Sequence, residues 1–204
     1  MRAALLPAIA GSGHWIFDLD GTLTVAVHDF AAIRRELAIP DGSDILEHLT
    51  ALPRHRSQPL HDRLQEIERQ LAALTQAATG ARQLLELLRE RGVQRGILTR
   101  NTRANALHTL ELAGLGGFFD PSHVVGRDEA RPKPDPDGLH QLARLWETGP
   151  ETMVMVGDYH YDLLAVRLAG ALTVHVDITR SFRWPDLADI SVTTLEELIV
   201  WIQP

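Results

Sequence analysis

Cysteine is absent from the 204-residue sequence, and its absence narrows the available chemistry before any motif is considered. Without a thiol the chain has no disulfide, no zinc–thiolate or iron–sulfur site and no cysteine nucleophile, so any metal must be held by oxygen or imidazole ligands. No apolar run approaches the roughly 20 residues of a membrane-spanning helix. Basic charge is also scarce, with 20 Lys and Arg against 27 Asp and Glu, which argues against nucleic acid or an anionic membrane as a partner.

The first 15 residues hold one Arg and a short apolar patch that Pro7 interrupts. This patch is too short for the apolar region of a secretory signal peptide. We therefore expect a cytoplasmic protein with a loose leader in front of a first strand near His14. The composition, 45% apolar and 23% charged, is that of an ordinary globular protein, and the length allows one full-sized domain with a small insertion.

From residue 80 onward, helical and strand-like patterns alternate along the chain. Strands apolar on both faces that alternate with helices predict an α/β fold built on a Rossmann-like parallel sheet. In such sheets, ligands bind at the carboxyl ends of the strands. The patterns predict helices over 81–91, 102–113, 136–148, 162–169 and from about 195, and strands over 93–98, 123–125, 153–156, 172–176 and 190–192.

Residues 24–79 interrupt this alternation with a purely helical segment. The pattern predicts helices over 29–38, 44–52 and 60–74, the last with an amphipathic leucine-rich stripe, and no convincing strand. We therefore expect one α/β core domain formed by residues 1–23 and 80–204, with a small all-helical domain at 24–79 inserted after the first strand.

Polar and charged side chains follow the predicted strands where a ligand is expected. In an extended segment, residues i and i+2 face the same way, roughly 6 to 7 Å apart, a gap that fits a phosphoryl group and its leaving oxygen. One carboxylate of such a pair can attack while the other, if protonated, gives a proton to the departing alcohol. The side chains at the strand ends are Asp18 and Asp20, then Thr99, Arg100 and Asn101, then Lys133, then Asp158 and Asp162.

Several carboxylates facing a phosphate dianion require a cation. A like-charged pair at 4 Å costs about 4 kcal/mol at an effective dielectric of ~20, and Asp158 and Asp162 add an unfavourable i,i+4 pair. Oxygen ligands favour a hard ion such as Mg²⁺, which is usually bound by one or two carboxylates and substrate phosphate. Lys133 and the Thr99 hydroxyl can then orient the remaining phosphate oxygens, where charge accumulates in the transition state.

Four motifs in order, DLDGT, ILTRN, RPKPDP and GDYHYD, resemble those of the haloacid dehalogenase superfamily, within it the phosphoglycolate phosphatase and beta-phosphoglucomutase group. The resemblance implies that residues 24–79 form a cap, that Asp18 is the nucleophile of an aspartyl-phosphate and that Asp20 is the general acid and then base. It also implies a Mg²⁺ site and phosphate ligands. The metal ligands would be Asp18, the backbone carbonyl of Asp20 and Asp158, with Asp162 supporting them, and the phosphate ligands Thr99 and Lys133, with Arg100 and Asn101 as neighbouring candidates.

The sequence thus predicts a Mg²⁺-dependent phosphatase acting on a small phosphorylated metabolite, similar to phosphoglycolate phosphatase. The alternatives are a sugar phosphomutase, an inert scaffold and a phosphoacceptor regulatory domain. In the last, the phosphoacceptor belongs to a different strand from the metal-binding acidic pair, which does not suit DLDGT. The segment 54–56, Arg-His-Arg, is either a solvated basic loop or a binding site for a substrate anion. The candidate substrate contacts are His28, Arg54, Arg56 and Tyr159, the last standing where small residues are common in the fourth motif.

Overall fold

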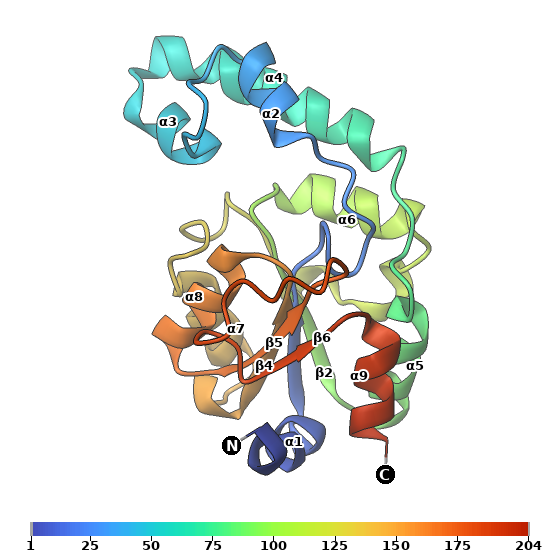
Figure 1. Cartoon of the computed structure of the whole chain (residues 1–204). Helices are drawn as coiled ribbons and strands as arrows, with labels where there is room; N and C mark the ends of the chain where they lie inside the picture. Colours follow the sequence, from blue (N-terminus) through green and yellow to red (C-terminus); the bar gives the residue numbers. More distant parts are fainter. Residues whose placement is uncertain (1, 204) are drawn as a thin grey trace.

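The computed structural model describes residues 2–203, with side chains from residue 5 onward (Figure 1). The strands are β1 His14–Phe17, β2 Gln94–Leu98, β3 Val124–Val125, β4 Met153–Gly157, β5 Leu172–Val176 and β6 Ile190–Val192. The helices are α1 Arg2–Gly11, α2 Phe30–Glu36, α3 Ile45–Ala51, α4 Arg54–Ala72, α5 Ala81–Glu90, α6 Arg103–Leu112, α7 Asp137–Leu145, α8 His160–Ala169 and α9 Leu195–Ile202. Short 3₁₀ turns occur at Gly116–Phe118, Pro121–His123 and Pro150–Thr152.

The six strands form one parallel sheet in the order β3-β2-β1-β4-β5-β6, which confirms the predicted α/β fold. Strand β1 lies in the middle, where Phe17 aligns with Ile97 of β2 and with Val156 of β4. Because all strands are parallel, their carboxyl ends share one edge. The loops that follow β1, β2, β3 and β4 are therefore brought together there.

Alternate residues of each strand pack against different helical layers. Trp15 and Phe17 belong to an apolar cluster with residues of α5, α6 and α9. Ile16, between them in sequence, belongs to a second cluster with residues of α7 and α8. Helices α5 and α9 lie on one side of the sheet and α7 and α8 on the other (Figure 1). The sheet is thus covered on both faces, as strands apolar on both faces require.

The expected loose leader is wrong, because residues 2–11 form helix α1. Its Ile9 is fully buried in the main apolar cluster, and Leu6 and Ala10 pack against that cluster. The helix contacts α9 and β6, so burial of its apolar residues fixes it to the core despite Pro7 in its interior. Of the helices in the described chain, none combines the length and the apolar character needed to cross a membrane.

Helices α2, α3 and α4 lie together beyond the carboxyl edge of the sheet (Figure 1). They enclose an apolar cluster of their own, which includes Ile33, Leu49 and Leu64. The carboxylates of Asp29 and Asp44 cap α2 and α3 by accepting from the backbone N–H groups of Ala32 and Glu47. This separate cluster gives the insertion its own packing.

Helix α4 begins at Arg54, earlier than the predicted start at Leu60. Segment 54–56 is therefore the first turn of a helix and not a loop, although its three side chains are exposed to solvent, as predicted. The N–H groups of Arg56 and Ser57 both donate to the carbonyl of Pro53, which starts the helical hydrogen bonds, and Ser57 is buried. The helix continues through Pro59.

Candidate active site

Strand β1 carries Asp18 to the carboxyl edge and then turns sharply. The N–H of Asp18 still donates to the Val156 carbonyl of β4, at 2.9 Å, so its backbone position is set by the sheet. Gly21 follows with a φ of +98°, and a Cβ at this position would stand 2.5 Å from Oδ2 of Asp158. Glycine therefore permits both the left-handed turn and the close approach of the turn to Asp158.

Lys133 reaches this edge from the loop after β3 and is only 2% exposed. Its Nζ lies 2.5 Å from Oδ1 of Asp18 and 2.5 Å from Oδ1 of Asp162, and it donates to the Leu98 carbonyl at 2.7 Å. These three acceptors match the three protons of the ammonium group. The cation is thereby fixed between carboxylates that come from β1 and from the start of α8.

Asp158 and Asp162 complete the carboxylate cluster from the end of β4 and the first turn of α8. Asp162 accepts a hydrogen bond from the N–H of Tyr159 at 3.0 Å, which places it at the positive end of the helix. Asp158 accepts from the hydroxyl of Thr22 at 3.3 Å. A Cβ on Gly157 would stand 2.4 Å from Cβ of Asp162, so this glycine lets α8 start close to the strand end.

Burial and mutual repulsion disfavour the ionised carboxylates. Burial raises the pKa of Asp18 well above its usual range, and the charges of Asp162 and Asp158 add to this against the opposing effect of Lys133. Burial, followed by the charge of Asp162, raises the pKa of Asp158 to about 7. For Lys133, burial alone would lower the pKa, but the charges of Asp162 and Asp18 outweigh it and the net pKa is raised. If all three carboxyl groups were ionised, the cluster would therefore have an excess of negative charge that the ammonium of Lys133 does not balance.

The same cluster fits a hard divalent cation. One carboxylate oxygen from each of Asp18, Asp158 and Asp162 lies within 4.8 Å of the others, and all the donors are oxygen, the type that Mg²⁺ prefers. A bound cation would favour the ionised forms that burial opposes. Asp162 is already engaged by Lys133 and by the backbone of Tyr159, so it is the member best suited to hold its neighbours in place.

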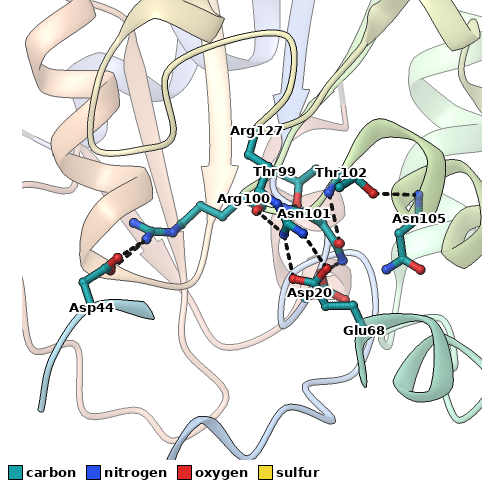
Figure 2. A network of polar contacts seen from close by, with 9 residues as sticks. All are labelled: Asp20, Asp44, Glu68, Thr99, Arg100, Asn101, Thr102, Asn105 and Arg127. Carbon is teal, nitrogen blue, oxygen red and sulfur yellow. Dashed lines mark hydrogen bonds and ion pairs between the residues drawn. The ribbon is translucent and has the colours of Figure 1, made fainter. Parts of the chain in front are cut away.

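The loop after β2 brings Thr99 and Asn101 to the same edge (Figure 2). The Thr99 hydroxyl accepts from the backbone N–H of Asn101 at 3.1 Å, and the side-chain amide of Asn101 reaches Oδ2 of Asp20 at 3.5 Å. Asp20 therefore meets this loop through a long contact, whereas Asp18 faces Lys133. The two aspartates of the first motif have different environments although only Leu19 separates them.

The side chains of Arg100 and Arg127 extend from loops of the core and bind carboxylates of the helical insertion (Figure 2). Arg100 Nη2 lies 2.7 Å from both carboxylate oxygens of Asp44, at the start of α3. Arg127 binds Glu68 of α4 in a fork at 2.7 and 2.9 Å, and both side chains are over 90% buried. Arg100, expected among the phosphate ligands, is thus held by a carboxylate of the insertion, and its guanidinium also stacks over Tyr161, 4.4 Å from the ring centre.

A cavity of about 420 Å³ lies between the sheet edge and the insertion. It is of the size that holds small-molecule ligands. Arg54 and Arg56 are not among its lining residues; within the described chain they are exposed in the first turn of α4. The predicted site residues that line it are Asp18, Asp20, His28, Thr99, Arg100, Asn101, Lys133, Asp158, Tyr159 and Asp162.

Sequence reasoning missed several residues of the cavity and its supports. Thr22 lies inside the quoted motif DLDGT, so its place beside Asp158 was open to prediction from that motif. For the others, no local signal in the sequence identifies them as cavity residues, because the cavity forms between parts of the chain that are distant in sequence. These residues are Arg34, Asp44, Glu68 and Tyr161.

The chain is similar to known proteins in both sequence and fold. Residues 14–170 match the family model described as haloacid dehalogenase-like hydrolase. A haloacid dehalogenase-like hydrolase domain-containing protein of Arabidopsis thaliana is 32% identical over 193 residues, 89% of this chain and 76% of the relative. An uncharacterized hydrolase of Saccharomyces cerevisiae is 31% identical over 195 residues, 92% of this chain and 89% of the relative. The crystal structure of a predicted phosphoglycolate phosphatase from Haemophilus somnus shares the fold, with a TM-score of 0.74, 17% identity and coverage of 94% of this chain and 98% of that one.

Proposed function

The chain belongs to the family of haloacid dehalogenase-like hydrolases, and from its site we propose that it is a Mg²⁺-dependent phosphatase that hydrolyses a small phosphate monoester through an aspartyl-phosphate. One observation carries the proposal. Lys133 Nζ lies 2.5 Å from Asp18, a residue 115 positions away in sequence, and the carboxylates of Asp158 and Asp162 surround the same point. These four groups match what phosphoryl transfer to a carboxylate requires: a nucleophile in Asp18, a fixed cation in Lys133, a carboxylate in Asp158 that can share a metal ion with Asp18, and Asp162 to hold the cation.

In the first step, an oxygen of Asp18 attacks phosphorus and the bond from phosphorus to the leaving oxygen breaks. The carboxyl group of Asp20, which lines the same cavity, gives its proton to that oxygen and releases the alcohol. Lys133 and the Thr99 hydroxyl hold the phosphoryl oxygens. Lys133 also keeps Asp18 oriented, since its ammonium contacts the Asp18 carboxylate before substrate binds.

In the second step, the ionised Asp20 takes a proton from water as the water oxygen attacks phosphorus. The bond from phosphorus to the Asp18 oxygen breaks, which releases inorganic phosphate and returns both carboxyl groups to their starting states. The carboxylates of Asp18 and Asp158, with the Asp20 carbonyl, would hold Mg²⁺, and the bound ion would offset the negative charge of the cluster and the phosphate. Asp162 keeps Lys133 in place and thus acts through it.

We also propose that residues 24–79 form a cap over this site, with residues 1–23 and 80–204 as the core. The apolar cluster within α2, α3 and α4 supports an independent packing unit. The two arginine–carboxylate pairs, Arg100 with Asp44 and Arg127 with Glu68, would hold the cap against the core. A closed cap limits the access of water and strengthens electrostatic interactions inside the cavity.

A hydrolysis screen over phosphorylated metabolites and a chromogenic aryl phosphate, with Mg²⁺ and with EDTA, tests the function. We expect phosphate release that depends on the metal. Transfer of label between positions of a hexose phosphate without phosphate release would instead indicate a sugar phosphomutase. A stable phosphoprotein with negligible turnover would indicate a phosphoacceptor domain, and no reaction with any ester would contradict the proposal.

A further inference from the structure

The cap side of the cavity has an apolar part, and it also contains Arg34 and the carboxylates of Asp44 and Glu68, which are paired with arginines of the core. Its wall includes Phe30 and Ile33 of α2, Ile45 and Leu46 of α3, and Leu64 of α4. Arg34, next to Ile33 on α2, lines the same wall. A guanidinium in such surroundings interacts with an anion more strongly than it does at an open surface, because the local dielectric is lower.

The partners of the cavity's cations set Arg34 apart. Lys133 contacts Asp18 and Asp162, and Arg100 contacts Asp44. Within the part of the chain that the structure describes, Arg34 forms no ion pair, and its Nε is shielded from solvent without a hydrogen-bond partner. A buried donor without a partner is unfavourable, so the guanidinium of Arg34 is not stabilised by the protein around it, and it lines a cavity where a ligand can bring an acceptor to its terminal N–H groups.

We propose that Arg34 binds a second anionic group of the substrate, a carboxylate or a phosphate carried by the leaving alcohol. The inference rests on the proposed phosphatase function, because the scissile phosphate must occupy the core side beside Asp18 and Lys133. The leaving group then extends toward the cap, where Arg34 is the cation without a carboxylate partner. The planar guanidinium binds either anion through two parallel hydrogen bonds. The substrate class is therefore a small ester with an anion at each end, of a size set by the cavity of about 420 Å³.

The adjacent Arg35 provides a matched control. It carries the same charge on the same helix, but its side chain is exposed and it does not line the cavity. Arg34→Gln and Arg35→Gln thus remove the same charge, one inside the site and one outside it. Arg34→Lys keeps the charge but loses the paired hydrogen bonds. Circular dichroism and thermal unfolding check that each variant is folded.

Two pairs of matched esters are the probes, each with Mg²⁺ and each measured as kcat/KM. Phosphoglycolate and ethyl phosphate differ by a carboxylate, and propane-1,3-diol bisphosphate and propyl phosphate differ by a second phosphate. We expect the wild type to prefer the charged member of at least one pair, and the pair identifies the anion. Arg34→Gln should lower that preference about tenfold or more, Arg34→Lys should restore part of it, and Arg35→Gln should leave it at the wild-type value.

The aryl phosphate separates the two ways in which the test can fail. Wild-type protein that is inactive toward the aryl phosphate and all four esters overturns the phosphatase function and the Arg34 inference with it. An active wild type that shows no preference in either pair, or hydrolyses none of the four esters, overturns the Arg34 inference alone. So does an equal change in preference for Arg34→Gln and Arg35→Gln.

Discussion

The two walls of the cavity differ in how their charges are balanced. On the core wall, the buried carboxylates of Asp18 and Asp162 both contact the ammonium of Lys133, and the half-buried carboxylate of Asp158 lies beside them. Where the cap meets the core, each carboxylate has its own guanidinium: Asp44 has Arg100 and Glu68 has Arg127. The unbalanced cluster is suited to bind ligands that supply the missing positive charge, whereas the balanced pairs are complete without a ligand.

This contrast gives the two regions different roles. The pKa values of Asp18 and Asp158 are raised. Clusters of carboxyl groups with raised pKa values are frequent in active sites, where burial and repulsion that suit the groups to catalysis also lower the stability of the fold. One-to-one ion pairs between two packing units set their relative position. We therefore expect changes on the core wall to act mainly on turnover and changes in the pairs to act mainly on stability.

The largest expected effect is on turnover. Asp18→Asn removes the proposed nucleophile, so kcat toward an aryl phosphate should fall at least about 10³-fold, equivalent to roughly 4 kcal/mol of the barrier. The free energy of unfolding should not decrease, because the neutral amide removes one of three crowded carboxylates. Stopped assays and urea unfolding measure the two quantities. Asp62→Asn, at an exposed site on α4, is the control, and undiminished turnover of Asp18→Asn would remove the nucleophile assignment.

The next largest effect is expected for Lys133, which is the only cation among the carboxylates of the core wall within the residues that the structure describes. Lys133→Met keeps the length of the side chain but leaves the charges of Asp18 and Asp162 without their partner, so we expect a loss of about 3 kcal/mol in the free energy of unfolding at pH 7. The loss should shrink on acidification, because protonated carboxyl groups no longer need the ammonium. Urea unfolding at several pH values measures it. A loss that does not vary with pH would mean that Lys133 stabilises the fold by packing alone.

A smaller effect is expected for the buried cap pair. Burial raises the pKa of Glu68 against the opposing hydrogen bonds of Arg127, so neither group is well placed without the other. Arg127→Ala and Glu68→Ala should each destabilise the protein, and the double variant should be less destabilised than their sum, with a coupling of about 1 to 2 kcal/mol. Urea unfolding of the four proteins gives this value. Additive losses would show that the pair does not fix the cap to the core.

The smallest effect concerns the second pair and its dependence on pH. Burial raises the pKa of Asp44, but the Glu47 backbone N–H and the Arg100 charge outweigh it, so the net pKa is lowered from 3.8. The stability that ionised Asp44 contributes is therefore present above pH 3.8 and is lost as the pH falls through the lower pKa of the folded protein. Asp44→Asn keeps a capping side chain on α3 while removing the charge.

We expect wild type to exceed Asp44→Asn by about 1 kcal/mol at pH 7, and this difference to shrink as the pH is lowered below 3.8. Urea unfolding of the two proteins across this range measures the difference. If the difference in unfolding free energy stays constant down to pH 2, the charge of Asp44 contributes nothing to stability. The Asp44→Asn variant would then be less stable for another reason.

The difference between the walls also explains what the sequence could predict. The core wall follows from periodicity: parallel strands bring Asp18, Thr99, Lys133 and Asp158 to one edge because each stands where a strand or its loop ends. Local periodicity and topology were sufficient for this part. The order and register of the six strands and the alternation of Trp15, Ile16 and Phe17 between two helical layers were not predicted and come from the structure.

The cap wall could not be predicted in the same way. Arg100 stands directly after Thr99 in the second motif, yet its guanidinium turns to Asp44, 56 residues earlier, which no local pattern reveals. Arg34 and Arg35 look alike on a predicted helix, and only the packing of α2 decides which one lines the cavity. Helix α1 was misjudged for a related reason, since Ile9 gains its burial from distant core residues.

The central claim is that the phosphoryl group passes to Asp18, and chemical trapping tests it most directly. A single turnover with a ³²P-labelled ester and Mg²⁺ is quenched in acid, and borohydride reduction then marks any acyl phosphate before peptides are sequenced by mass spectrometry. We predict a transient label, sensitive to hydroxylamine, with reduction only at Asp18, and no label on Asp18→Asn. Label on another residue, or rapid turnover that never produces a labelled protein, would contradict the account.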